Sequence, residues 1–109
     1  MRRNEAHELL VKALILALSK TGVCRVWEHP TGAAFRGKRM IHFGLVGSAD
    51  ISGILKGGRR LEIEVKTGSG RQTLEQKAFG EMITAMGGLH IVARDLNETV
   101  RKVLYAGSN

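Results

Sequence analysis

The sequence predicts an α/β fold in which a mixed central sheet is flanked by helices on both faces. Segments with helical periodicity alternate along the chain with short segments of strand character. One expected helix, over residues 73–86, lies between strand segments 60–66 and 89–94, and such a helical crossover makes two strands parallel. A Gly-Gly turn signal earlier in the chain adds an antiparallel pair. We expect a single domain spanning residues 1–109.

Residues 3–20 are expected to form the first helix. Its apolar side chains recur at helical spacing, and further apolar residues widen the stripe beyond one face. Such a helix needs cover on two sides, from the sheet and from either another helix or a second subunit. Residues 24–29 alternate as a strand that Pro30 ends. Trp27 in this strand could stack on a nucleobase, but we expect it in the core.

Residues 30–39 are expected to form a flexible basic loop. Its glycines allow the backbone to approach a ligand closely. Arg36, Lys38 and Arg39 place three positive charges in its last four residues, and we expect them to contact a nucleic-acid backbone. The alternative is an ordinary solvated loop. Residues 40–45 then lead into the next strand.

The centre of the sequence is typical of a β-hairpin. Residues 50–55 and 60–66 have strand character, and Lys56-Gly57-Gly58 between them is a turn signal. In the second segment apolar residues alternate with Glu62, Glu64 and Lys66, which predicts one apolar and one polar face.

Pairing of these two strands predicts that Asp50 lies alongside Glu64 and Lys66 at one end of the sheet. Two neighbouring carboxylates repel each other, and a hard divalent cation between them keeps both ionised. Mg²⁺ or Mn²⁺ held in this way polarises a phosphoryl oxygen and lowers the pKa of a bound water. A lysine beside the ion can orient that water. The alternative is a surface hairpin whose polar face meets only solvent.

The second helix is expected to begin after Thr73. Thr73 and Gln76 have the spacing of a capping box, which is a structural role for Gln76. Four apolar residues at i, i+3, i+4 and i+7 are expected to pack on the sheet: Phe79, Met82, Ile83 and Met86. The last expected elements are a strand over residues 89–94 and a helix that starts at Asp95.

The composition favours a protein that binds polyanions. The chain has 17 Lys and Arg against 10 Asp and Glu, a net charge of +7, and small basic proteins most often bind nucleic acid. The alternative is charge that serves only solubility. The single Cys24 cannot form an internal disulfide, which favours a reducing compartment. No apolar run approaches the roughly 20 residues that span a bilayer. We therefore expect a cytoplasmic protein without a membrane partner.

A set of motif residues in this chain resembles the VRR-NUC (virus-type replication-repair nuclease) domain, a branch of the PD-(D/E)XK nuclease superfamily. The set comprises Gly47-x-x-Asp50, Glu64-x-Lys66, Gly70, Gln76 and the closing Gly87-Gly88. The resemblance covers most of the chain, from the first helix to the last, and implies a restriction-endonuclease-like core. The proline of the superfamily motif is replaced by Ala49, a departure that this branch tolerates.

The resemblance assigns roles to residues of this chain. It implies that Asp50 and Glu64 are metal ligands, that Lys66 is the catalytic lysine, and that Gln76 supports the active site. An acidic residue of the first helix would complete the metal site.

Two residues of the first helix, Glu5 and Glu8, are candidates for that third ligand. Glu8 and Lys12 stand at i,i+4, where they can form a solvated ion pair. Glu5 has no such partner, because position 9 is Leu, so we favour Glu5.

The activity implied by the resemblance is a Mg²⁺- or Mn²⁺-dependent endonuclease that hydrolyses phosphodiester bonds in DNA. Stand-alone members resemble resolvases, homodimers that cut four-way (Holliday) junctions during DNA repair. Alternatives are a non-catalytic DNA-binding module, a monomeric nuclease directed to flaps or nicks, and an RNA-directed nuclease. Residues expected to contact DNA are Arg36, Lys38, Arg39, Arg59 and Arg71.

Overall fold

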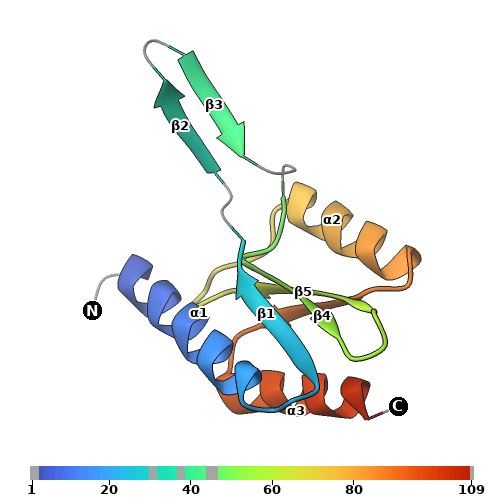
Figure 1. Ribbon diagram of the computed structural model, residues 1–109. Coiled ribbons are helices and arrows are strands. Elements are labelled where there is room, and N and C mark those ends of the chain that lie inside the picture. The colour runs from blue at the N-terminus through green and yellow to red at the C-terminus, as the bar shows by residue number, and fades with distance from the viewer. Residues whose placement is uncertain (1–2, 30–31, 37–38, 44–46, 109) are drawn as a thin grey trace.

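The computed structural model describes residues 3–29, 32–36, 39–43 and 47–108 (Figure 1). The described residues form three helices and six strands. In chain order these are α1 (Arg3–Ser19), β1 (Cys24–Glu28), β2 (Gly32–Arg36), β3 (Arg39–Phe43), β4 (Ile51–Leu55), β5 (Arg60–Val65), α2 (Leu74–Ala85), β6 (Leu89–Ala93) and α3 (Leu96–Gly107). In the described parts of the chain, no helix is long and apolar enough to cross a membrane.

The central sheet has the strand order β1-β4-β5-β6. Strand β4 runs antiparallel to both β1 and β5, whereas β6 runs parallel to β5. Helix α2 connects β5 to β6, as expected for a crossover between parallel neighbours. The predicted mixed sheet and the predicted parallel pair are both confirmed.

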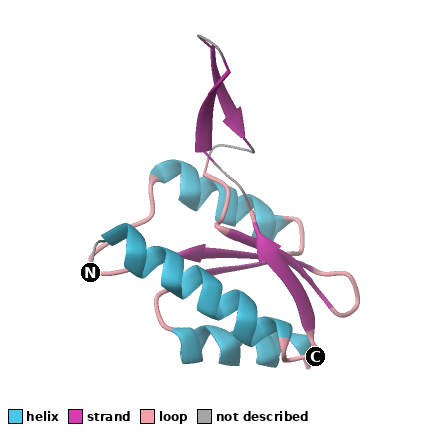
Figure 2. Cartoon of the chain, turned by 60° about the vertical axis from the view of Figure 1, so that its left-hand side comes forward, coloured by secondary structure: helices cyan, strands magenta, loops and turns pink. Residues whose placement is uncertain are grey.

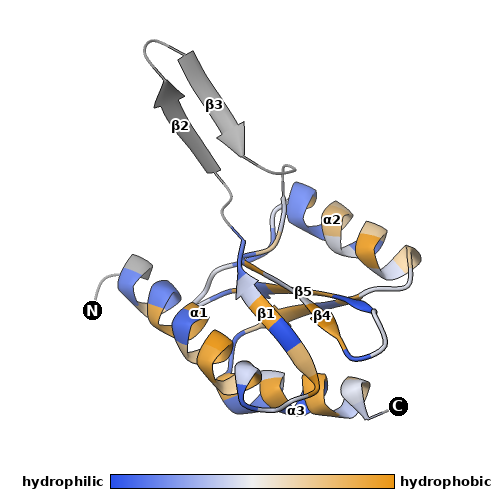
Figure 3. Cartoon of the chain, viewed as in Figure 1, coloured by the Kyte–Doolittle hydropathy of each residue, from blue (hydrophilic) through white to orange (hydrophobic). Residues whose placement is uncertain are grey.

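Helices cover both faces of this sheet (Figures 1 and 2). Helices α1 and α3 contact each other and pack on one face, and α2 packs on the other face over β5 and β6. The main core lies between the sheet and the α1–α3 layer, where the apolar stripes of both helices turn inward (Figure 3). This core contains Leu14 and Leu18 of α1, Ile51 and Ile63 of the sheet, and Val103 of α3.

Strand β5 is buried on both faces, which differs from the predicted division into an apolar and a polar face. Glu62 and Glu64 point away from the main core, yet they are buried. The reason is that β5 has a strand on each side and α2 above the second face. The surface hairpin considered as the alternative is therefore excluded for these two glutamates.

Helix α2 contacts the sheet along a narrower stripe than its sequence predicts. Phe79 and Ile83 are buried, but Met82 and Met86 are exposed, so the expectation that all four pack on the sheet is wrong. The contact line runs through Gly80, where an added Cβ would lie 2.7 Å from the His90 ring. This close approach turns the two methionines away from the interface.

The prediction of a loop over residues 30–39 is wrong. Strand β2 pairs antiparallel with β3, with Gly32 opposite Phe43 and Arg36 opposite Arg39, and this pair is separate from the central sheet. The hairpin projects away from the body of the molecule (Figures 1 and 2). Pairing with residues 39–43 supplies the backbone hydrogen bonds that the glycine-rich sequence alone did not indicate. Lys38 lies outside the described residues, as do the side chains of Arg36 and Arg39.

Trp27 lies on the surface, contrary to the expectation that it belongs to the core. Its side chain is 47% exposed. The neighbouring Val26 is buried in the core beneath α1, and successive side chains of a strand point to opposite faces. Trp27 therefore lies on the face opposite α1.

Helix α1 is covered on two sides, as predicted, and its second partner within the chain is α3. Val11, Leu14 and Leu18 are buried. Leu9 and Leu16 remain 55% and 60% exposed. Part of the wide apolar surface of this helix is therefore not covered by the described chain.

Candidate active site

The β4–β5 hairpin sets the position of the two candidate carboxylates. Its register pairs Ile51 with Ile63. Asp50 comes one residue before Ile51, and Glu64 comes one residue after Ile63, so the two residues follow the last pair of the ladder on neighbouring strands. Convergence of their carboxylates with Lys66 stays a prediction.

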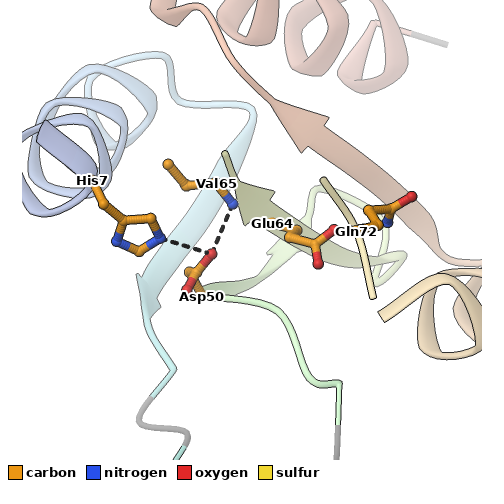
Figure 4. A network of polar contacts seen from close by, with 5 residues as sticks. All are labelled: His7, Asp50, Glu64, Val65 and Gln72. Carbon is orange, nitrogen blue, oxygen red and sulfur yellow. Dashed lines mark hydrogen bonds and ion pairs between the residues drawn. The ribbon is translucent and has the colours of Figure 1, made fainter. Parts of the chain in front are cut away.

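The carboxylate of Asp50 is held by one backbone group and approached by one side chain (Figure 4). Its Oδ2 accepts a hydrogen bond from the Val65 N–H at 2.7 Å. The same oxygen lies 3.4 Å from Nε2 of His7, which projects from the first turns of α1. Asp50 is thus tied both to β5 and to the helix layer.

The carboxylate of Glu64 is almost fully buried, at 1% exposure. Its Oε2 accepts a hydrogen bond of 2.7 Å from Nε2 of Gln72, in the segment before α2. Its Oε1 is buried and has no hydrogen-bond partner within the described chain. Figure 4 shows the two carboxylates turned to different partners, Asp50 toward His7 and Glu64 toward Gln72.

A cavity of about 200 Å³ opens at this end of the sheet, between the first turns of α1 and α2. Its lining residues are His7, Asp50, Val65, Lys66, Thr67, Gly70, Arg71 and Gln76. Four residues singled out from the sequence, Asp50, Lys66, Arg71 and Gln76, are therefore brought together here. Two larger cavities, of about 640 and 590 Å³, lie beside β6 and do not include this group.

Gln76 has the structural role considered for it from the sequence, and its support of an active site stays a prediction. Its Oε1 accepts a hydrogen bond from the Thr73 N–H at 2.8 Å, and Thr73 Oγ1 accepts one from the Gln76 N–H at 3.1 Å. The predicted capping box is confirmed. Because the cap orients the first turn of α2, it also places Gln76 in the cavity wall.

Gly47, the first residue of the Gly-x-x-Asp pattern, packs directly on the start of α2. Its φ is +83°, a conformation that favours glycine. A Cβ at this position would collide with the carbonyl group of Glu75. The glycine therefore allows the segment before Asp50 to approach the helix.

The residue of α1 that lines the cavity is His7, not Glu5. Glu5 and Glu8 are exposed, and neither belongs to the cavity wall. Glu5 is about 200° around the helix axis from His7, since successive residues turn by about 100°. Within the ranges that the structure describes, no three His, Cys, Asp or Glu side chains lie near enough to share a metal ion. The ligand role of Glu5 stays a prediction from the resemblance.

Arg59 and Arg71 occupy opposite ends of the β4–β5 pair. Arg71 lines the cavity. Arg59 follows the hairpin turn and donates to the carbonyl oxygens of Gly87 and Gly88, at 3.0 and 3.4 Å, where α2 ends. Arg59 thus has a structural role, and DNA contact by either arginine stays a prediction.

Two further titratable groups have pKa values displaced by burial. Burial lowers the pKa of His90 in β6, and the charges of Glu64 and Glu62 oppose this shift. Burial raises the pKa of Cys24, which disfavours the reactive thiolate. Cys24 therefore has the character of a half-buried structural residue.

Neither His7 nor Gln72 is predicted from the sequence as a residue of the site. Gln72 precedes the helix cap without any motif, and His7 lies among residues of a helix whose rotation about its axis is set by packing. No local signal identifies either residue.

The carboxylates of Asp50 and Glu64 have the chemistry of ligands for a hard divalent cation, although Glu64 does not line the cavity that contains Asp50. Oxygen ligands from carboxylates suit Mg²⁺ and Mn²⁺. A buried carboxylate oxygen without a donor is costly unless a proton or a cation neutralises it, and Glu64 Oε1 is such an oxygen. The chain matches none of the protein-family models and none of the curated proteins with which it was compared.

Proposed function

We propose that this protein is a Mg²⁺- or Mn²⁺-dependent endonuclease with a restriction-endonuclease-like fold of the VRR-NUC type. The observation that carries the proposal is the buried Glu64 carboxylate, whose Oε1 has no partner among the described residues, beside Asp50 at the end of the sheet. The supporting observation is that Lys66 lines the same cavity as Asp50.

Asp50 and Glu64 are the residues that would hold the ion. When bound, the ion supplies positive charge to a phosphoryl oxygen and a lowered pKa to a water. The hydrogen bond from the Val65 N–H fixes the direction of the Asp50 carboxylate. His7 has its Nε2 beside the same oxygen and acts as a positioning residue.

Lys66 and Arg71 add positive charge to the wall of the cavity. A lysine in this position orients the attacking water and offsets the charge that develops on the phosphate. Gln76, fixed by its helix cap, completes the wall. These residues bind and orient a phosphodiester against the two carboxylates.

Branched DNA is the proposed substrate, cut by a homodimer in a reducing, cytoplasmic compartment. The net charge of +7 supports attraction to a polyanion. The exposed apolar side chains of α1 support a subunit contact.

The test is cleavage of a labelled four-way junction, a flap and a linear duplex in Mn²⁺ or EDTA. Glu64→Gln is expected to lower the cleavage rate by at least about 100-fold, because a ligand is lost while the buried hydrogen bond to Gln72 is kept. Glu62→Gln is the matched control, a buried acid on the same strand and face. It should cleave at close to the wild-type rate.

The pattern of products separates the alternatives. Paired symmetric cuts in the junction that need Mn²⁺ and Glu64 support a dimeric resolvase. Cuts in the flap alone keep the nuclease and reject the resolvase. Binding of DNA without metal-dependent cleavage of any substrate would refute the nuclease and leave a binding module.

A further inference from the structure

On one face of the sheet, the half formed by β1 and β4 has no helix of the described chain packed over it. Helix α2 covers this face only over β5 and β6, and the two other helices pack on the opposite face. On the open half, Trp27 of β1 and Ile54 of β4 are 47% and 43% exposed. Large apolar side chains on neighbouring strands of one sheet face are normally covered, so this surface is unusual for a chain that works alone.

Strand register shows that the open half belongs to the face that carries Glu64. Trp27 pairs with Ser52, which pairs with Glu62. Ser52 Oγ donates to Glu62 Oε1 at 3.1 Å, so these side chains point to the same side. Glu64 stands two residues after Glu62 and shares that face.

Two arginines border the apolar surface. Arg25, Ile54 and Arg60 form one cross-strand row, next to the row that contains Trp27. Arg25 is exposed, and the side chain of Arg60 is about half exposed. Glu62 Oε2 accepts a hydrogen bond of 3.0 Å from Arg60 Nε. The surface thus combines an aromatic ring with flanking positive charge.

The open surface lies close to the candidate active site. Ser52, the partner of Trp27, stands two residues after Asp50, which is about 7 Å along the strand. A ligand that covers Trp27 therefore lies within two residues of the Asp50 position along this strand.

We propose that Trp27 binds an unpaired nucleobase by stacking, with Arg25 and Arg60 contacting the adjacent phosphates. Aromatic rings on open sheets bind single-stranded nucleic acid by stacking, and arginines supply the charge. The inference rests on the proposed function and specifies its substrate as DNA with an unpaired segment near the cleavage site. A second copy fits this surface less well, because a twofold contact would bring the same arginines together.

The experiment uses the fact that Trp27 is the only tryptophan of the chain. Tryptophan emission is recorded in EDTA during titration with oligothymidylate, with fully paired duplex, and with inorganic polyphosphate. Oligothymidylate should quench the emission, whereas polyphosphate, which has no bases, should leave it nearly unchanged. Cleavage is not needed, so Glu64→Gln should give the same quenching as the wild type.

Affinity for a labelled oligothymidylate then tests the ring itself. Trp27→Ala should weaken binding about tenfold or more, and Trp27→Phe should restore most of it. Met86→Ala, which removes an exposed apolar side chain at the end of α2, should bind as the wild type does.

Three results would overturn the inference: no quenching by oligothymidylate, equal binding by Trp27→Ala and wild type, or a dimer that Trp27→Ala dissociates with oligonucleotide affinity unchanged. Metal-dependent cleavage without quenching would reject the stacking surface and keep the nuclease. Quenching without cleavage of any substrate would reject the nuclease and keep the stacking surface.

Discussion

Glu62 and Glu64 lie two residues apart on one face of β5, and both are buried. Glu62 has a partner for each oxygen, Ser52 for Oε1 and Arg60 for Oε2. Glu64 has Gln72 for Oε2, and its Oε1 is without a partner in the described part of the chain. The same alternation of residues therefore produces one acid whose two carboxylate oxygens have hydrogen-bond partners and one acid with an oxygen that has none. A buried acid with a missing partner is the feature expected of a ligand site.

Thermal unfolding with and without Mn²⁺ tests this difference. A cation that binds only the folded state at a hundredfold excess over its Kd stabilises by about 2.7 kcal/mol, a rise in Tm of roughly 10 °C. We expect this rise for the wild type and for Glu62→Gln, and none for Glu64→Gln.

Without metal, Glu64→Gln should unfold at or above the wild-type Tm, because it removes a buried carboxyl group whose Oε1 has no partner among the described residues. An equal response of Glu64→Gln and wild type to Mn²⁺ would contradict the ligand assignment.

At the scale of elements, the β4–β5 hairpin and the α2 cap follow from short-range signals. Gly57 and Gly58 have φ values of +93° and +94°, which two consecutive glycines adopt without strain. The capping box spans only four residues of sequence, Thr73 to Gln76. The β2–β3 pair was not predicted, because its glycines and charges indicate a loop until the pairing partner is known.

Gly47→Ala is expected to destabilise the protein by at least about 2 kcal/mol. The substitution forces a positive φ on a residue with a Cβ and drives that Cβ into the carbonyl of Glu75 at the start of α2. Urea unfolding measures the effect.

Gly57→Ala is the matched control, since Gly57 also has a positive φ but a Cβ there would meet nothing within 4 Å. Gly57→Ala should lower the free energy of unfolding by only about 1 kcal/mol. Equal losses for the two variants would show that the contact with Glu75 does not matter.

At the scale of the whole molecule, α1 leaves an apolar surface that the described chain does not cover. Leu9 and Leu16 are seven residues apart, so they lie on the same side of the helix, and both are exposed. The wide apolar surface of α1 is thus divided among the sheet, α3 and this outer surface. The outer surface is the place where we expect the second subunit of the proposed homodimer.

Leu16→Glu should raise the dissociation constant of the homodimer at least about 100-fold, because the dimer would bury an unpaired charge. Sedimentation at increasing protein concentration measures this change. Leu74→Glu, which alters an exposed leucine of α2, should leave the association unchanged. A wild-type protein that is monomeric at all concentrations would refute the dimer.

Much of the fold was predictable because its signals are local. Periodicity, turn glycines and a cap depend on residues a few positions apart, and they predicted α1, the β4–β5 pair, α2 and the parallel β6. The hairpin register also places Asp50 beside Glu64, and the segment that follows β5 carries Lys66 into the same cavity.

The remaining features depend on how the elements pack on one another. The rotation of α1 about its axis brings His7 to Asp50 and leaves Glu5 in solvent. The position of α2 over β5 and β6 buries Glu64 and leaves Trp27 exposed on the other half of the face. Strand alternation assigns a side chain to a face, but it does not say what covers that face. Only the tertiary structure decides that, because cover comes from segments far away in the sequence.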